Sequence, residues 1–241
     1  MAAAKGDEVA REVAFLSLAV SALQTEGSVG QLAYAALRKA ILDTDVYAPG
    51  VDLRLDEKGL AAALGVSRTP VREGLARLEH EGLVRIVPRR GVYIVRKSKA
   101  EIIEIITVWA ALEGMAARLV CERASDAEIA SLRELFASFA EGEVRLRLDE
   151  YSLANLRFHS RIIELSGSGL IVSTADRLLV HVRGIRGSMI GEDDRAERSI
   201  VDHIDIIEAL EHHEAETAER LVRDHALALA ADVEQTVRHL S

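Results

Sequence analysis

Cysteine, proline and aromatic residues are scarce in this sequence. The one cysteine among the 241 residues, Cys121, excludes an internal disulfide and indicates a reducing, intracellular environment. With only three prolines, and with Ala, Leu, Arg and Glu abundant, the chain is expected to be mainly helical. No apolar run approaches the ~18 residues that a membrane-spanning helix needs, and charged residues between positions 5 and 12 interrupt any secretory signal. A cytoplasmic protein without a membrane partner is therefore expected.

Negative charge is in excess, but it is unevenly distributed. The formal net charge is −9, whereas residues 31–96 carry eleven Lys/Arg and eight Asp/Glu, a local charge of +3. The rest of the chain therefore carries −12. A basic segment joined to an acidic body is typical of a protein in which one domain contacts phosphate and the other does not. The length of the chain also favours two domains.

The first 96 residues predict a small domain of three helices followed by a hairpin. Hydrophobic spacing in residues 1–28 indicates an N-terminal arm or an accessory amphipathic helix, and both readings stay open. The domain itself is expected at residues 29–96, with helices at about 31–43, 56–64 and 67–81. Strand-like runs at 83–87 and 92–95 then predict a β-hairpin. This order of elements is that of a winged helix-turn-helix.

Residues 60–75, LAAALGVSRTPVREGL, have the spacing of a helix-turn-helix. Gly65 suits the sharp turn, because a positive φ there would strain any other residue. Ser67 is expected to cap the following helix through its hydroxyl group, and Pro70 fits the first turn, where its missing N–H matters little. The buried stripe of that helix is then expected to consist of Val71, Leu75 and Leu78.

The outer side of this helix and the tip of the hairpin carry groups that suit DNA. Arg68 and Arg72 can each form a bidentate hydrogen bond to guanine, worth ~1–3 kcal/mol of discrimination. Hydroxyl groups suit phosphate oxygens or base edges. The predicted DNA-contacting residues are Lys58, Ser67, Arg68, Thr69, Arg72, Arg89, Arg90 and Gly91. The alternative is an ordinary solvated helix face, but the hairpin at the right distance favours DNA.

Three stretches of this region resemble the GntR family of transcription regulators. They are LGVSRTPVRE at residues 64–73, RLEHEGLV at residues 77–84 and the Arg-Gly pair at residues 90–91. The resemblance covers residues 31–96 and implies a bacterial homodimer that binds a short inverted repeat in double-stranded DNA. Gly74 departs from the alanine usual in the family. It is expected to slacken the helix, since glycine costs about 1 kcal/mol of helix propensity.

After a short polar linker at residues 97–99, residues 100–241 show helical periods and no strand pattern. Helices are expected at about 99–123, 126–141, 147–165, 170–184, 197–211 and 214–239. Four stretches within them, at residues 112–118, 155–159, 202–210 and 218–225, resemble the FCD domain of FadR-like regulators. The resemblance implies an all-α bundle that binds a small-molecule metabolite effector and contributes to dimerisation.

Three histidines and an asparagine of this domain predict a metal site. Asn155 and His159 are four residues apart, so they project from one face of a helix. His203 and His225 lie on two later helices, each among apolar residues that face a bundle core. Three converging imidazoles suit a divalent transition metal, zinc or nickel, with an amide oxygen or water completing the site. The alternative is that each is a hydrogen-bonded core histidine.

Four further residues of this domain are candidate effector ligands: Trp109, His181, Arg183 and Arg186. The two arginines can pair with a carboxylate, or they are ordinary surface charges. Trp109 stands where many FCD domains carry an arginine that meets the ligand. The resemblance therefore implies an apolar pocket wall there, unless the ring simply packs in the bundle. His181 either lines the pocket or is an ordinary helix residue.

Together these features predict a DNA-binding regulator whose operator affinity is controlled by an effector, with a metal, in the helical domain. A metalloenzyme is the rival, because three histidines with an open position also describe catalytic sites. No partnered general base is recognisable on these helices, so an enzyme is not expected. A third reading, an architectural DNA-binding protein without a ligand, would leave the buried histidines without a purpose.

Overall fold

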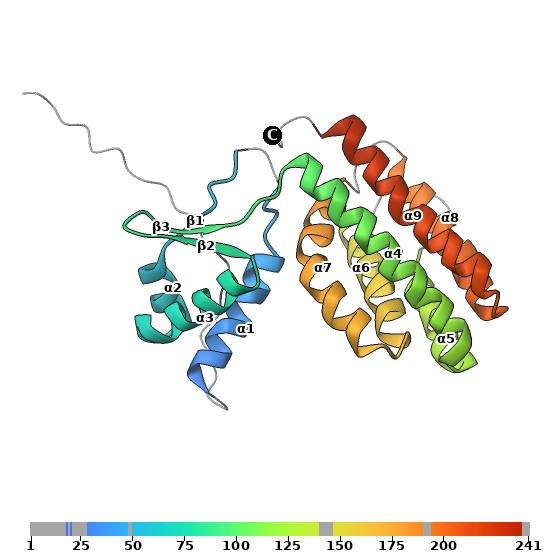
Figure 1. Cartoon of the computed structure of the whole chain (residues 1–241), viewed down its shortest axis with the longest axis horizontal. Helices are drawn as coiled ribbons and strands as arrows, with labels where there is room; N and C mark the ends of the chain where they lie inside the picture. The colour runs from blue at the N-terminus through green and yellow to red at the C-terminus, as the bar shows by residue number, and fades with distance from the viewer. Residues whose placement is uncertain are drawn as a thin grey trace, which may run out of the picture. The chain divides into compact units, whose positions relative to one another are not determined.

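The computed structural model describes residues 18, 20, 28–47, 50–139, 147–189 and 194–237 (Figure 1). The chain divides into two compact units. The N-terminal unit comprises the residues up to Ile41 together with Gly50–Val95, and the C-terminal unit comprises Leu42–Pro49 together with the chain from Arg96. The predicted arm or accessory helix at residues 1–28 lies outside the described residues, apart from positions 18, 20 and 28.

The N-terminal unit contains three helices and a small antiparallel sheet. Its elements are α1 (Val29–Leu42), β1 (Arg54–Leu55), α2 (Glu57–Leu64), α3 (Arg68–His80), β2 (Val84–Val87) and β3 (Gly91–Ile94). The strand order is β1-β3-β2, with Arg54 opposite Tyr93 and Val84 opposite Ile94. The predicted winged helix-turn-helix is confirmed. Strand β1 was not predicted, because two residues are too few to show an alternating pattern.

The turn between α2 and α3 follows the prediction at one end and departs from it at the other. Gly65 ends α2 with a φ of 69°, the left-handed conformation that glycine adopts without strain. Ser67 is the N-cap residue of α3, but its side chain makes no capping hydrogen bond, so the predicted hydroxyl cap is wrong. The reason is local: the third residue of α3 is Pro70, which lacks one of the two N–H groups that an N-cap side chain normally binds.

Gly74 has a packing role that its helix propensity does not reveal. Val71, Leu75 and Leu78 are buried as predicted, and they pack α3 into the core of the unit. A Cβ atom at Gly74 would lie 3.2 Å from both the Cα and the backbone N of Tyr34 on α1. The missing side chain therefore lets α3 pack closely against α1. Glycine allows this packing although it lowers the helix propensity of α3.

The C-terminal unit is a bundle of helices in which α4 is central. Its helices are α4 (Lys99–Arg123), α5 (Asp126–Glu134), α6 (Leu148–Leu165), α7 (Gly169–Met189), α8 (Arg195–Glu211) and α9 (Ala215–Thr236). Helices α4 and α9 lie side by side along most of their length (Figure 1), and α4 also contacts α6, α7 and α8. Ser98 and Ser125 start α4 and α5 with capping boxes, which explains why both helices begin where the sequence predicted.

Two helix ends differ from the prediction. Helix α5 stops at Glu134 instead of near residue 141, and α7 continues to Met189 instead of ending near residue 184. Gly184 lies inside α7 and does not break it, since glycine only weakens a helix interior. After Arg96 the described residues contain no strand, as expected. None of the described helices has the length and apolar character that crossing a membrane requires.

Candidate metal centre and DNA interface

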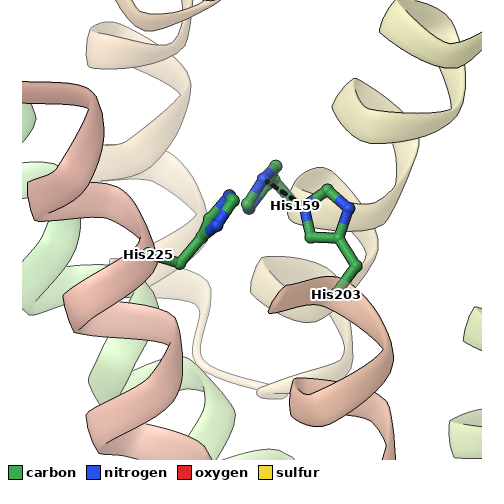
Figure 2. A group of neighbouring side chains, drawn as sticks. All are labelled: His159, His203 and His225. Carbon is green, nitrogen blue, oxygen red and sulfur yellow. Dashed lines mark hydrogen bonds between the residues drawn. The ribbon is translucent and has the colours of Figure 1, made fainter. Parts of the chain in front are cut away.

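His159 on α6, His203 on α8 and His225 on α9 converge inside the C-terminal unit (Figure 2). Each offers a ring nitrogen, and these nitrogen atoms all lie within 4.8 Å of one another. The Nε2 atoms of His159 and His203 are 3.3 Å apart. All three side chains are buried, because each lies on the apolar side of its helix, near Ile162, Ile207 and Leu229. The structure therefore brings together three residues that are far apart in the sequence.

Each of the three imidazole rings directs its other nitrogen, Nδ1, to a separate partner. The partners are Glu113 Oε1 for His159, Tyr151 Oη at 3.2 Å for His203, and Asp202 Oδ2 at 2.9 Å for His225. A carboxylate can only accept, so Glu113 and Asp202 select the tautomers of His159 and His225 that carry hydrogen on Nδ1. The Nε2 lone pairs of these rings are then available to the centre of the cluster. Such outer partners are typical of metal-binding histidines.

Burial also holds the three histidines in the form that binds metals. Desolvation is the main cause that lowers the pKa of His159 and His203 well below its usual range, and the nearby Arg186 guanidinium acts in the same direction. Burial lowers the pKa of His225 as well. Near neutral pH the cluster therefore consists of uncharged imidazoles.

Asn155 lies one helical turn before His159 on α6 and is only 4% exposed. Its Oδ1 atom has no hydrogen-bond partner among the described residues. A buried amide oxygen without a partner costs on the order of 1–3 kcal/mol. This unpartnered oxygen fits the predicted role of Asn155 as a fourth donor, beside the three imidazoles.

Glu113 on α4 is a central residue of the site that the sequence reading did not identify. It is fully buried, contacts His159 and accepts a hydrogen bond from Trp109 Nε1 at 2.7 Å. Burial raises the pKa of Glu113, and the Arg186 guanidinium, 3.9 Å away, opposes that shift. The signal was present in the sequence, because Glu113 is the one acidic residue on the otherwise apolar buried face of α4.

These contacts bear on two expectations. The carboxylates of Glu113 and Asp202 contact the Nδ1 atoms of His159 and His225, and the sequence reading named neither carboxylate as a partner. Both carboxylates bind the Nδ1 side of a ring, away from the shared centre, which is a supporting position and not that of a general base. Trp109 is 1% exposed and donates to Glu113. It therefore packs in the bundle and supports the outer layer of the site.

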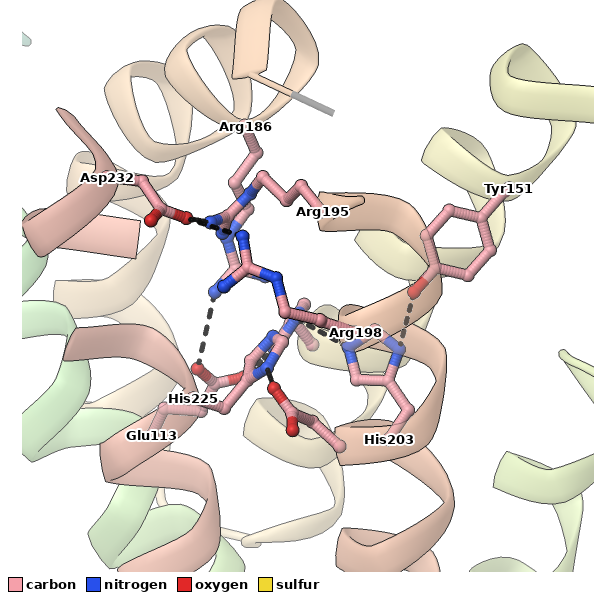
Figure 3. Close-up of polar contacts among 10 residues, drawn as sticks. Glu113, Tyr151, Arg186, Arg195, Arg198, His203, His225 and Asp232 are labelled. Carbon is pink, nitrogen blue, oxygen red and sulfur yellow. Dashed lines mark hydrogen bonds and ion pairs between the residues drawn. The ribbon is translucent and has the colours of Figure 1, made fainter. Parts of the chain in front are cut away.

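Arginine side chains gather beside this cluster. Figure 3 shows Arg186, Arg195 and Arg198 on one side of Glu113 and His225. Arg186 is 4% exposed, and its Nε atom lacks a hydrogen-bond partner among the described residues. Arg195 pairs with Asp232 of α9. A cavity of about 20 Å³, enough for one water-sized group, is lined by Arg195, Arg198, Ser199, Asp202, His225 and Ala228.

The other two predicted effector residues contact a different part of the C-terminal unit. His181 Nδ1 lies 2.7 Å from the hydroxyl oxygen of Tyr47, and Arg183 pairs with Asp43 at 2.8 Å. Tyr47 and Asp43 belong to the short segment between α1 and β1. Of the four predicted effector residues, Arg186 and Trp109 therefore lie at the histidine cluster, whereas His181 and Arg183 bind this segment.

The predicted DNA-contacting residues lie on the surface of the N-terminal unit. Seven of the eight are exposed, and Gly91 is partly exposed. In α3 the exposed residues lie opposite the buried stripe, as the helical period predicts. Arg89 at the wing turn has a φ of 61°, a left-handed conformation that is uncommon outside glycine. Arg72 Nε pairs with Glu57 at 2.8 Å, and its side chain is 63% exposed, so the remaining N–H groups of the guanidinium face solvent.

Comparisons with known proteins agree with this organisation. The profile described as "Bacterial regulatory proteins, gntR family" matches residues 30–94, and the profile "FCD domain" matches residues 104–228. An uncharacterized HTH-type transcriptional regulator of Agrobacterium vitis is 39% identical over 61% of this chain and 85% of its own. The HTH-type transcriptional repressor RspR of Escherichia coli is 27% identical over 86% and 90%. The solved structure of E. coli McbR/YncC, 22% identical, has the same fold with a TM-score of 0.73 over 88% of this chain and 100% of that one.

Proposed function

We propose a function for this chain from its family, because it belongs to the GntR family of bacterial transcription regulators and carries an FCD domain. A divalent metal and an anionic effector, both bound in the FCD domain, control its affinity for DNA. The N-terminal unit binds the DNA. The family consists of regulators and not of enzymes. A bacterial regulator meets its DNA in the cytoplasm, and we therefore propose a cytoplasmic location.

One observation carries the metal proposal: three buried imidazoles each bring a ring nitrogen within 4.8 Å of the others, while each Nδ1 atom faces an outer partner. A shared cation would bind these converging nitrogen atoms. The residues that would hold the metal are Asn155, His159, His203 and His225, and zinc or nickel suits this donor set. When bound, the metal supplies a Lewis acid that accepts an oxygen atom of the effector.

The charges around the cluster favour an effector with a carboxylate or similar anion. Arg186 is buried, and its Nε–H has no acceptor among the described residues. Arg195 adds a second buried guanidinium, whose pKa is lowered to about 10 chiefly by burial. A buried cation needs a partner, and an arginine fork suits a carboxylate. Arg186 would thus orient the effector, while Glu113 and Asp202 hold the imidazoles in place.

For the DNA-binding step, the proposed contacts are those on α3 and the wing. Arg68 and Arg72 would read base edges in the major groove, and Arg89 would contact the backbone or an adjacent groove. We propose that two chains form a dimer on an inverted repeat, since a two-fold protein matches a palindromic site. The name of the relative RspR supports repression as the mode of regulation.

The test of this proposal is a metal-binding experiment on the whole chain. The wild-type protein, His203→Ala and His212→Ala are each dialysed against zinc and against nickel, and metal content is then measured by mass spectrometry. His212 is the matched control, because it is an exposed histidine whose Nδ1 lies 2.8 Å from the Glu208 carbonyl oxygen. We expect one metal ion per chain in the wild type and in His212→Ala, and none in His203→Ala.

Thermal unfolding of the same samples gives a second measurement. A ligand that binds only the folded state at a hundred times its Kd stabilises it by about 2.7 kcal/mol. A chelator should therefore lower the Tm of the wild type and of His212→Ala, and should leave His203→Ala unchanged. A wild-type protein without bound metal and without a response to chelator would rule out the metal centre.

A further inference from the structure

The segment that leaves α1, residues 42–47, is built into the C-terminal unit although both of its ends lead into the N-terminal unit. We name it the connecting segment. Val46 and Tyr47 are 3% and 1% exposed, which is unusual for a short segment without regular structure. A segment that buries a tyrosine so fully is packed against a neighbouring element. The contacts of Tyr47 identify that element.

The connecting segment binds α7 at three successive points. The Tyr47 hydroxyl lies 2.7 Å from His181 Nδ1, and Asp43 pairs with Arg183 at 2.8 Å. At Gly184 a Cβ atom would lie 2.9 Å from Cδ2 of the Tyr47 ring, so the ring rests directly on the helix backbone. A larger residue at position 184 would displace the ring.

The hydrogen bond between Tyr47 and His181 is one between neutral groups. Burial raises the pKa of the Tyr47 phenol above its usual range and lowers the pKa of His181 to about 4. Both groups are therefore uncharged near neutral pH, and the hydrogen bond joins a neutral phenol to a neutral imidazole. Burial is the largest cause of both pKa shifts, ahead of the nearby Lys97, Glu101 and Arg96.

Helix α7 also carries Arg186, which reaches the histidine cluster. Arg186 lies only two residues beyond Gly184, and its guanidinium is 3.9 Å from Glu113, the partner of His159. A single rigid helix thus holds the connecting segment through His181, Arg183 and Gly184, and contacts the proposed effector site through Arg186. A change at Arg186 that moves α7 must also move the residues packed on it.

We propose that the connecting segment transmits occupancy of the metal and effector site to the DNA-binding unit, with Tyr47 and His181 as the positioning residues. Asp43 directly follows Leu42, the last residue of α1, so a displacement of α7 is passed covalently to the end of that helix. The inference rests on the proposed function, because it needs a ligand that binds near Arg186. Coupling of this kind requires a structural element that has two alternative arrangements. Binding at the effector site and binding to DNA must each shift the equilibrium between these arrangements.

Hydrogen exchange with mass spectrometry tests the proposal on the whole chain, with zinc ion as the probe. Tyr47→Phe removes only the hydroxyl group, and Gly184→Ala disturbs the same contact from the helix side. Tyr34→Phe is the matched control, since it removes a phenol that binds Glu81 within the N-terminal unit. In the wild type and in Tyr34→Phe, we expect zinc to slow exchange in α6, α8 and α9, and also in the connecting segment and α1.

In Tyr47→Phe and Gly184→Ala, zinc should still slow exchange in α6, α8 and α9. The effect on the connecting segment and α1 should be lost, a change of about fivefold or more, at the lower end of typical coupling between sites. The inference would be overturned if zinc slowed exchange in the connecting segment and α1 of Tyr47→Phe as much as in the wild type. It would also be overturned if zinc protected α6, α8 and α9 of the wild type but neither the connecting segment nor α1.

A further arm separates failure of the inference from failure of the proposed function. If zinc protects none of α6, α8 and α9 in the wild type, the proposed metal site is wrong. The variant Arg186→Gln then tests the transmission without metal, because it alters the buried end of the same α7 contact. It should change exchange in the connecting segment, and this change should vanish when it is combined with Tyr47→Phe. The same response in both backgrounds, or none in either, would overturn the inference.

Discussion

The two units present their candidate functional groups in opposite ways. In the N-terminal unit Arg68, Arg72 and Arg89 lie at the surface, where water solvates their charge. In the C-terminal unit Glu113 and Arg186 are almost fully buried, together with the three histidines. A surface charge contributes little to folding, whereas a buried charge is tolerated only with partners. The comparison teaches that function and stability are separable in the first unit and coupled in the second.

The largest effect should come from Glu113→Ala in metal-free protein. The change removes the carboxylate that lies 3.9 Å from the buried Arg186 guanidinium, and with it the acceptor of Trp109 and His159. Breaking a buried pair in this way costs about 3–5 kcal/mol. Each 1 kcal/mol corresponds to about 2–4 °C in Tm for a chain of this size. Urea unfolding should show this loss.

The control is Glu219→Ala, which breaks an ion pair with the partly exposed Arg118. Surface pairs of this kind contribute about 0–1 kcal/mol. If the two variants lose the same stability, burial is not what distinguishes the polar groups of the C-terminal unit.

A smaller effect is expected for Asp202→Asn, which weakens the outer partner of His225 without removing a metal ligand. Loss of such a partner typically lowers metal affinity about 10–100-fold. Titration of zinc against a coloured chelator would measure the change. Asp205→Asn, an exposed position on the same helix, should leave the affinity unchanged. Equal affinities for both variants would show that the Asp202 contact does not support the ring.

In the N-terminal unit, Arg68→Ala should change binding and leave stability unaltered. Losing one bidentate base contact costs about 1–3 kcal/mol of discrimination, about 5- to 150-fold in affinity for the preferred sequence. Arg89→Ala should weaken binding evenly across sequences. It should also reduce, by about 1, the slope of the logarithm of the binding constant against the logarithm of the salt concentration. Electrophoretic shifts at fixed salt, with DNA obtained by in vitro selection, would separate these outcomes. Unchanged discrimination in Arg68→Ala would contradict its assignment.

The same difference between the units decides what the sequence could predict. The helix-turn-helix follows from local signals, since the turn glycine and the apolar period each act within a few residues. The three histidines were predicted from the spacing of Asn155 and His159, from the apolar residues around His203 and His225, and from the resemblance to the FCD domain. The role of Glu113 was missed, because its partners lie on other helices and only the folded bundle brings them together. Likewise, nothing local in residues 42–47 indicates that Tyr47 binds His181, 134 residues away.

The smallest effect is expected at His213, an exposed histidine outside the buried cluster. Its Nδ1 lies 2.8 Å from the Cys121 carbonyl oxygen and its Nε2 lies 3.0 Å from Asp126 Oδ1. Both partners only accept, so both contacts form fully when the ring is protonated. The Cys121 carbonyl, and then Asp126, raise the pKa of His213. A raised folded-state pKa means that this stabilisation is complete below about pH 6.5, the unperturbed value, and is lost as the pH rises through the folded value.

Urea unfolding across this pH window should therefore show that His213→Ala is less stable than the wild type in acid, and that the difference shrinks as the pH rises. His212→Ala is the matched control, because the neighbouring His212 ring is also exposed and its Nδ1 lies near the Glu208 carbonyl oxygen. The difference between wild type and His212→Ala should be smaller and should vary less with pH. Because His213 is exposed, salt should weaken its contribution, unlike that of the buried pair at Glu113. A difference for His213→Ala that is constant with pH would show that the ring acts in its neutral form and not as an imidazolium bridge.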